Sequence, residues 1–394
     1  MDEIKRLVRE ATPHMVGTRR LIHRQPELGY REFGTAALVE RALSGLDGVG
    51  VSRVTGTGVV GVMAGAKPGP VLLLRADLDA LPIQEETGLP FASEIPGVMH
   101  ACGHDGHVAI LLAAAKILSP MRATLPGTVK FVFEPNEEEV GALAMIEAGV
   151  LENPTVTAAA SLHLWAPLPL GRISVDDGMT WAGMDHFTIK VRGRGGHTGS
   201  PHLAIDPILV ASHIVVGLQA LQSRELDPLL SSSLVFGRIT GGRIANVIPD
   251  DVELEGTIRY LFDGRDDGPH KPRVRLQEIA SNIAKAYRAE AEVNFYCSQP
   301  PLNNHPRMAA LGRAAALATA GPDCLQKCQN MGGEDFSEFS ARVPSVMAVI
   351  GAGSEKSGAV HSHHSSRFAI DEDALPIALE WLLRTALSYL RDAG

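Results

Sequence analysis

The feature that most constrains the fold is a regular alternation of short apolar segments with helical ones in the first half of the chain. The apolar segments at 71–74, 128–133 and 158–164 read VLLL, TVKFVF and AAASLHL, as expected for strands buried on both faces. Segments 107–118 and 142–151 lie between them and have helical spacing. This alternation predicts an α/β fold with a mostly parallel sheet flanked by helices.

The pattern changes at about residue 184. From there the chain is expected to form a strand, a helix, two strands, a helix and a final strand. This βαββαβ order predicts an α+β, ferredoxin-like domain with an antiparallel sheet. After residue 296 the α/β pattern returns, and 394 residues are enough for two domains. We therefore predict a discontinuous catalytic domain at 1–183 and 296–394, with a smaller domain inserted at 184–295.

Composition excludes several classes of protein. The net charge of −9 argues against a nucleic-acid partner, which would require a basic face. No run of about 18 apolar residues is present, and the N-terminal segment lacks the apolar region of a signal peptide. The four cysteines are irregularly spaced and do not form a disulfide pattern. We expect a cytoplasmic protein that contacts no membrane.

Side chains of metal-ligand type follow each predicted strand of the larger domain. They are Asp77 and Asp79 after the first strand, Glu134 and Glu137–Glu139 after the second, His163 at the end of the third, and His361, His363 and His364 after the strand at 345–351. The segment MHACGHDGH at 99–107 adds further histidines, a cysteine and an aspartate at a helix start.

Each of these groups has an ordinary explanation when taken alone, such as a solvated run of glutamates or a core histidine. In an open α/β sheet, however, the residues that follow the strands meet at one edge, where ligands bind. Buried carboxylates and imidazoles are costly there unless a cation neutralises them. Cysteine, histidine and glutamate are the ligand set for zinc and similar ions. The number of candidate ligands predicts two metal ions.

Eight segments resemble, in content and order, those of the aminoacylase-like metallohydrolases. They are RADLDALPIQE, MHACGHDGH, FEPNEEE, SLHLW, GRGGHTGSPH, GGRIANVIP, MGGEDFS and HSSRFAIDEDALP. The resemblance is strongest to the amidohydrolase branch, which includes N-acyl-amino-acid amidohydrolases, hippurate hydrolase and indole-acetyl-amino-acid hydrolases. The segment HRQPELGYRE at 23–32 also resembles that branch. The resemblance implies an inserted lid domain that dimerises, and therefore a homodimer or higher homo-oligomer.

The resemblance also implies roles for individual residues. It implies that the metal ligands are Cys102, His104, Glu138, His163 and His364. Glu137 matches the general base, and Asp79 matches an aspartate that orients a residue of the metal site. We choose His364 over His363 because it keeps the four-residue step to Phe368 that the family pattern has.

Three residues of the inserted domain match substrate-handling positions. His197 matches a histidine that reaches the partner subunit's site and stabilises an oxyanion. Asn246 and Arg259 match residues that hold the substrate carboxylate, a task suited to a guanidinium. The alternatives are a loop histidine for His197 and an ordinary strand-surface arginine for Arg259.

The chain departs from the family pattern at two places. It has FEPNEEE where FQPAEEG is usual, which places Glu134 and Glu139 nearby and adds negative charge to the expected site. The triple glutamate leaves the register open by one position, and we assign Glu137 and Glu138 by their distance from Pro135. Ser366 replaces the proline of the HxPxF pattern.

Taken together, these residues predict a metal-dependent amidohydrolase acting on N-acyl amino acids, with Zn, Mn, Co or Ni bound, two ions per subunit. A metallo-dipeptidase or carboxypeptidase is the alternative within the same chemistry. Catalysis by Cys102 as a nucleophile, and a non-catalytic metal-binding scaffold protein, are more distant alternatives.

Overall fold

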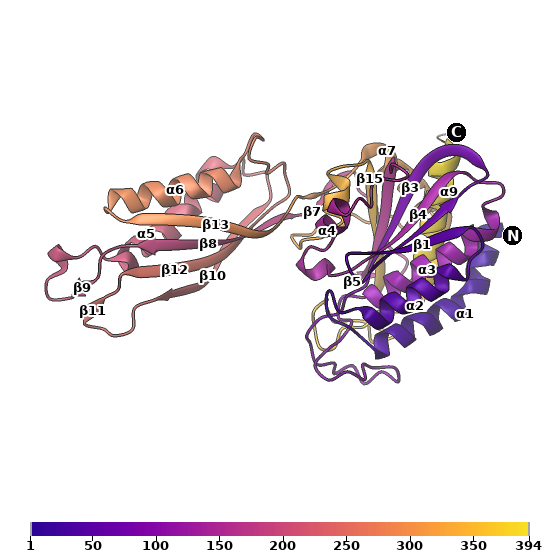
Figure 1. Ribbon diagram of the computed structural model, residues 1–394, viewed down its shortest axis with the longest axis horizontal. Helices are drawn as coiled ribbons and strands as arrows, with labels where there is room; N and C mark the ends of the chain where they lie inside the picture. The colour runs from indigo at the N-terminus through magenta and orange to yellow at the C-terminus, as the bar shows by residue number, and fades with distance from the viewer. Residues whose placement is uncertain (1, 393–394) are drawn as a thin grey trace. The chain divides into compact units, whose positions relative to one another are not determined.

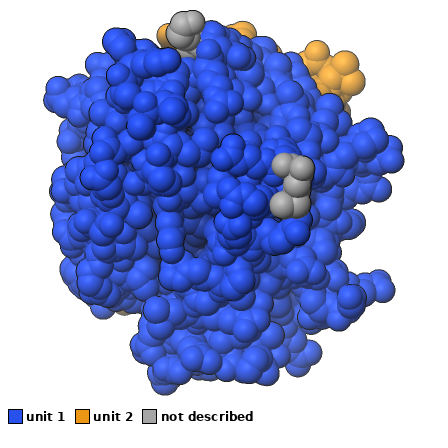
Figure 2. All heavy atoms as spheres, turned by 90° about the vertical axis from the view of Figure 1, so that its right-hand side faces the viewer, with its two compact units in different colours: residues 1–178, 303–328, 335–394 blue, residues 179–302, 329–334 orange. Residues whose placement is uncertain are grey.

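The structure is a computed structural model that describes residues 2–392, and it contains two compact units. The first is formed by residues up to 178, by 303–328 and by the chain from 335 onward, and the second by 179–302 and 329–334. The separate segments of the first unit form one continuous surface in Figure 2. Residues 296–302 and 329–334 thus group with the second unit. The domain boundaries and the lid role derived from the sequence stay predictions.

The first unit contains the large sheet, whose strands run in the order β1-β2-β4-β3-β5-β15-β6 (Figure 1). Their bounds are Val49–Val54 (β1), Gly58–Ala64 (β2), Lys67–Asp77 (β3), Pro126–Glu134 (β4), Ala158–Pro169 (β5), Ile173–Ser174 (β6) and Ser345–Gly353 (β15). The central strands β4, β3, β5 and β15 are parallel to one another. Strands β1, β2 and β6 join the edges in antiparallel pairings. The predicted mostly parallel sheet is confirmed, and the antiparallel edge strands β1 and β2 are an addition to it.

Helices flank this sheet. Their bounds are Glu3–Arg24 (α1), Phe33–Ser44 (α2), His104–Met121 (α3), Ala142–Glu147 (α4), Pro306–Ala320 (α7), Ser337–Ser340 (α8) and Ala374–Asp392 (α9). Alternate residues of β3, including Leu72, Leu74 and Ala76, join a core with apolar residues of α1, α3 and α9. None of the helices within residues 2–392 combines the length and hydropathy needed to span a membrane.

The parallel strands place their carboxyl ends at one edge of the sheet. Strand β3 ends at Asp77 and β4 at Glu134, while His163 lies in the middle of β5. Helix α3 begins at His104, directly after Gly103, whose φ of 90° lies in the left-handed region that favours glycine. The turn at Gly103 therefore brings the start of α3 to the edge where the strands end.

The second unit has its own antiparallel sheet, with strand order β10-β12-β8-β13. The bounds of its strands and helices are Gly183–Arg192 (β8), Pro207–Ala220 (α5), Ser232–Gly241 (β10), Asp251–Tyr260 (β12), Pro272–Ala286 (α6) and Glu290–Gln299 (β13). The short strands Gly196–His197 (β9) and Val247–Ile248 (β11) pair with each other. Residues of α5 and α6 share one apolar core with alternate residues of the sheet. The predicted βαββαβ order is confirmed.

Candidate metal centre

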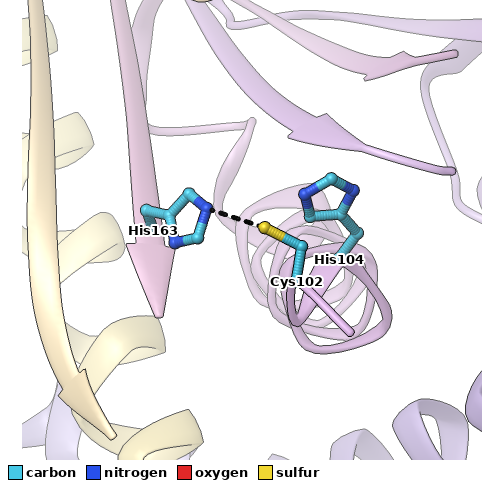
Figure 3. Close-up of side chains that lie close together, drawn as sticks. All are labelled: Cys102, His104 and His163. Carbon is cyan, nitrogen blue, oxygen red and sulfur yellow. Dashed lines mark hydrogen bonds between the residues drawn. The ribbon is translucent and has the colours of Figure 1, made fainter. Parts of the chain in front are cut away.

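Three predicted ligands lie side by side at the carboxyl edge of the large sheet. Cys102, His104 and His163 are buried, and one ligand atom of each lies within 4.8 Å of the others. The Sγ atom of Cys102 is 3.6 Å from Nε2 of His163 (Figure 3). The loop before α3, the start of α3 and strand β5 supply them, so segments far apart in the sequence converge here.

Hydrogen bonds fix which ring nitrogen of each histidine faces the cluster. Nδ1 of His163 lies 2.9 Å from the carbonyl oxygen of Leu164, which can only accept a hydrogen bond. Nδ1 of His104 donates in the same way to the carbonyl of Asp79 at 3.0 Å. Each Nδ1 therefore carries a proton, and in the neutral form of each ring Nε2 keeps a lone pair. Among the described residues, Nε2 of His104 has no hydrogen-bond partner although it is buried.

Glu138 and His364 form a second group with Cys102. Oε1 of Glu138 lies 3.3 Å from Nε2 of His364. The backbone N–H of His364 donates to the carbonyl of Ala101 at 2.9 Å, which holds the late loop against the segment that carries Cys102. Cys102 thus belongs to both groups, as a ligand located between two ions would.

Asp79 connects the two groups. Its carboxylate lies 3.2 Å from Nδ1 of His104 through one oxygen and accepts the backbone N–H of Glu138 at 3.1 Å through the other. One side chain therefore orients a histidine and a glutamate of the cluster at once. Carboxylates that hold ligand histidines in this way tune and orient metal sites.

Glu137 lies next to His104 of the cluster. Its Oε2 is 3.8 Å from Nε2 of His104, and its Oε1 accepts a long hydrogen bond of 3.5 Å from the backbone N–H of Asp335. Its side chain is 11% exposed, so solvent reaches it. Glu139 is exposed and belongs to none of the ligand groups among the described residues. Only the first two glutamates of the run point to the cluster.

Burial and charge shift the pKa values of the cluster strongly. Burial raises the pKa of the Cys102 thiol well above its usual value and lowers the pKa of His163 well below its usual value. Burial also opposes charge on His104, but Asp77, Cys102 and Asp79 together outweigh it and raise the pKa of His104. A thiol in this environment becomes a thiolate only beside a cation. The lone pairs, the thiol and the carboxylates fit a divalent metal.

One expectation about charge is wrong. Glu134 was expected to add negative charge to the site, but it is buried near the carboxyl ends of β3 and β4, where it pairs with Arg75 at 2.9 Å. The same guanidinium pairs with Asp77 at 2.7 Å and with Asp335 at 2.6 Å, and all four side chains are fully buried. Sequence reasoning missed Arg75, although an arginine directly after the apolar run VLLL was a signal for it.

Two other histidines lie close to the cluster, but their side chains form hydrogen bonds to other groups. His107 donates from Nδ1 to Asp77 at 2.7 Å and accepts the backbone N–H of Leu164 at Nε2, at 3.0 Å. His107 is buried, and both of its ring nitrogens are hydrogen-bonded, so neither is available to bind a metal. His363 stacks on Trp165, with ring centroids 4.1 Å apart, and its Nε2 donates to the Leu164 carbonyl at 3.0 Å. This leaves His364 to face Glu138.

The predicted substrate residues lie in the second unit. His197 is exposed in β9, and its Nδ1 accepts the backbone N–H of Gly199 at 2.8 Å. The carbonyl of Asn246 accepts the hydroxyl of Thr198 at 3.2 Å, so Asn246 lies beside the His197 loop. Arg259 in β12 donates to the carbonyl of Met331 at 3.0 Å, and partial burial lowers its pKa.

Comparison with known proteins gives the family. Residues 73–388 match the sequence profile of peptidase family M20/M25/M40. The chain belongs to this family. An N-acetylcysteine deacetylase of Bacillus subtilis is 37% identical over 380 residues, covering 95% of this chain and 97% of the relative. Thermostable carboxypeptidase 1 of Saccharolobus solfataricus is 37% identical over 383 residues, covering 96% of this chain and 95% of the relative.

A solved structure extends the likeness to three dimensions. A dinuclear metal-binding peptidase of the M20 family from Bacillus subtilis superposes with a TM-score of 0.83 at 33% identity, covering 97% of this chain and 99% of that protein. Membership of this family and the ligand groups at the sheet edge both indicate a metal-dependent enzyme. The chain is a metal-dependent hydrolase of amide bonds.

Proposed function

We propose that the protein removes the acyl group from N-acyl amino acids. One observation carries the proposal. Nε2 of His104, Nε2 of His163 and the thiol of Cys102 lie together at the sheet edge, and Oε2 of Glu137 is 3.8 Å from Nε2 of His104. The likeness to an N-acetylcysteine deacetylase supports an acyl-amino-acid substrate.

The residues suited to hold two divalent ions are Cys102, His104, Glu138, His163 and His364. Bound divalent ions supply Lewis-acid polarisation of the amide carbonyl and make water a better nucleophile. Oε2 of Glu137 is placed to take the water's proton and to deliver it to the leaving nitrogen. The backbone N–H of Asp335 holds the other oxygen of Glu137 in place.

Substrate recognition is assigned to the second unit. Because Nδ1 of His197 accepts a hydrogen bond, the neutral ring carries its proton on Nε2, which can donate to a developing oxyanion. Arg259 and Asn246 are proposed to hold the substrate carboxylate. The contact of Arg259 with Met331 uses one of its N–H groups and leaves others of the guanidinium for a carboxylate.

A homodimer is proposed through the second unit. Strand β10 is an edge strand, and Val235 and Ile239 on it are 54% and 61% exposed. Val216 on α5 is 72% exposed beside a cavity of about 370 Å³ between α5 and β10. An apolar edge of this kind needs a partner. Light scattering should report a dimer that Val216→Lys converts to a monomer, and a monomeric wild type would contradict this assignment.

The likeness to a carboxypeptidase favours a second candidate, hydrolysis of peptides with a free carboxyl end. Metal-stripped enzyme reconstituted with Zn, Mn, Co or Ni should be assayed on N-acetyl and N-benzoyl amino acids and on free dipeptides, with bound ions counted by elemental analysis. Faster turnover of the acyl amino acids supports the proposal, and faster turnover of dipeptides replaces it. Absence of turnover on the whole panel would favour a binding protein.

The cysteines also bear on the location of the protein. The thiols of Cys102, Cys297, Cys324 and Cys328 form no disulfide, which fits a cytoplasmic location.

A further inference from the structure

The segment 23–32, HRQPELGYRE, contacts the loops that carry the proposed site. Three hydrogen bonds connect them: His23 Nδ1 to Asp105 at 2.9 Å, the Ala80 N–H to the Glu27 carbonyl at 2.8 Å, and the Asn136 N–H to Glu32 Oε1 at 2.9 Å. Each contacted residue is the direct chain neighbour of a site residue, the pairs being Asp105 with His104, Ala80 with Asp79, and Asn136 with Glu137. The segment therefore holds the backbone beside three site residues.

The contact made by Glu32 is the most specific of the three. Glu32 is 0% exposed and precedes α2, but its side chain does not cap that helix. Its Oε1 instead accepts the N–H of Asn136, which is 104 positions away in the sequence. Its Oε2 accepts the hydroxyl of Thr57 at 2.7 Å. Both oxygens of a buried carboxylate are thus used to hold other segments.

The loop that Glu32 holds has an unfavourable backbone conformation. Asn136 has a φ of 60° and Val140 a φ of 65°, both in the left-handed region. This region is particularly unfavourable for a β-branched residue such as Val140. Such conformations persist at functional sites when the surrounding structure holds them. Gly29 packs closely against the same loop, because a Cβ atom at this position would lie 1.8 Å from Oδ1 of Asn136.

We propose that Glu32 is a positioning residue that sets the orientation of Glu137 and Glu138. The loop is held on one side by Asp79, which accepts the N–H of Glu138, and on the other by Glu32, which accepts the N–H of Asn136. Glu137 lies between the two held N–H groups, and Glu138 carries one of them. The inference rests on the proposed metal site but requires no particular substrate.

The test compares Glu32→Leu with two matched variants. Glu32→Leu removes both acceptors, whereas Glu32→Gln keeps an oxygen for the Asn136 N–H. Thr57→Val removes the other hydrogen bond of the same carboxylate and leaves the contact with Asn136 intact. The readouts are Zn²⁺ affinity of the metal-stripped protein, titrated against a competing chelator, thermal stability, and kcat and KM of the reconstituted enzyme.

We expect Glu32→Leu to weaken Zn²⁺ binding by about 10–100-fold and to lower kcat with little change in KM. Glu32→Gln should recover most of the Zn²⁺ affinity, and Thr57→Val should lose stability but not affinity. Wild-type Zn²⁺ affinity in Glu32→Leu, or an equal loss of affinity in Thr57→Val, overturns the proposal. If Glu32→Leu does not fold, Gly29→Ala decides by the same titration, since it displaces the side chain of Asn136. Because the titration uses no substrate, its outcome is independent of N-acyl amino acid hydrolysis.

Discussion

Replacement of Glu137 by glutamine tests the proposed chemistry most directly. The amide oxygen of glutamine can accept the same hydrogen bond from Asp335 that Glu137 accepts at 3.5 Å, so the side chain keeps its position. The partly exposed site tolerates the change in charge, and we expect stability within about 0.5 kcal/mol of wild type. The variant cannot take a proton from water. A general base contributes about 10²–10⁴-fold in rate, or roughly 2.7–5.4 kcal/mol of barrier.

The assay measures kcat, KM and bound metal on the same reconstituted preparation. We expect kcat to fall by that factor while KM and metal content stay unchanged, because the lost interaction is made only in the transition state. Glu139→Gln is the matched control, since Glu139 is the exposed neighbour in the same run and should keep full activity. Turnover at the wild-type rate in Glu137→Gln, or an equal loss in Glu139→Gln, would refute the assignment of the base.

Three further predictions concern the metal and the buried charges. A chelator should abolish activity and added divalent metal should restore it, and Cys102→Ser should lower metal content; activity that survives chelation would revive the thiol as nucleophile. Arg75→Met should destabilise the protein by about 3–5 kcal/mol in urea unfolding, because it leaves buried carboxylates without their cation; a wild-type unfolding midpoint would contradict this. Burial raises the pKa of Asp105, but the charges of Arg19 and His23 outweigh it and hold that pKa well below its usual range. The stability that Asp105 contributes is therefore present above its unfolded pKa of about 3.9 and is lost as pH falls below it. Because Asp105 also raises the pKa of His23, the difference between wild type and Asp105→Asn should grow from about pH 7 to 5 as His23 becomes protonated. Urea unfolding should then give a smaller difference at about pH 3 than at about pH 5, and a difference that keeps widening below about pH 4 would show the opposite linkage for Asp105.

The sequence was sufficient where a residue's neighbours in the chain determine its environment. The apolar runs predicted the parallel strands, and the residues after those strands predicted which segments would meet at the sheet edge. Strands β1 and β2 were not predicted, since VGVSRV and GVVGVMA are short and interrupted by glycine, although β2 is mostly buried in the structure. The order βαββαβ was readable because its strands alternate with helices of clear periodicity.

The sequence was insufficient where the partner of a residue lies far along the chain. Arg75 and Asp335 are 260 positions apart, and no local pattern connects them. The tautomers of His104 and His163 depend on carbonyl groups whose positions only the folded backbone gives. The same holds for the choice between the two adjacent histidines of the HSHH run, because the stacking of His363 on Trp165 determines which one faces Glu138.

The buried cations separate the structural carboxylates from those suited to a metal. Glu134 pairs with Arg75 at 2.9 Å, and Asp105 pairs with Arg19 at 2.7 Å. Glu138 instead lies against His364, a side chain that can offer a lone pair rather than a permanent charge. The Glu138 side chain is 18% exposed, but its Oε1 atom is buried, and a carboxylate oxygen that faces a neutral imidazole is suited to bind a cation. Glu134 and Glu138 are four positions apart in one acidic segment, and their different partners support a structural role for the first and the proposed metal-ligand role for the second.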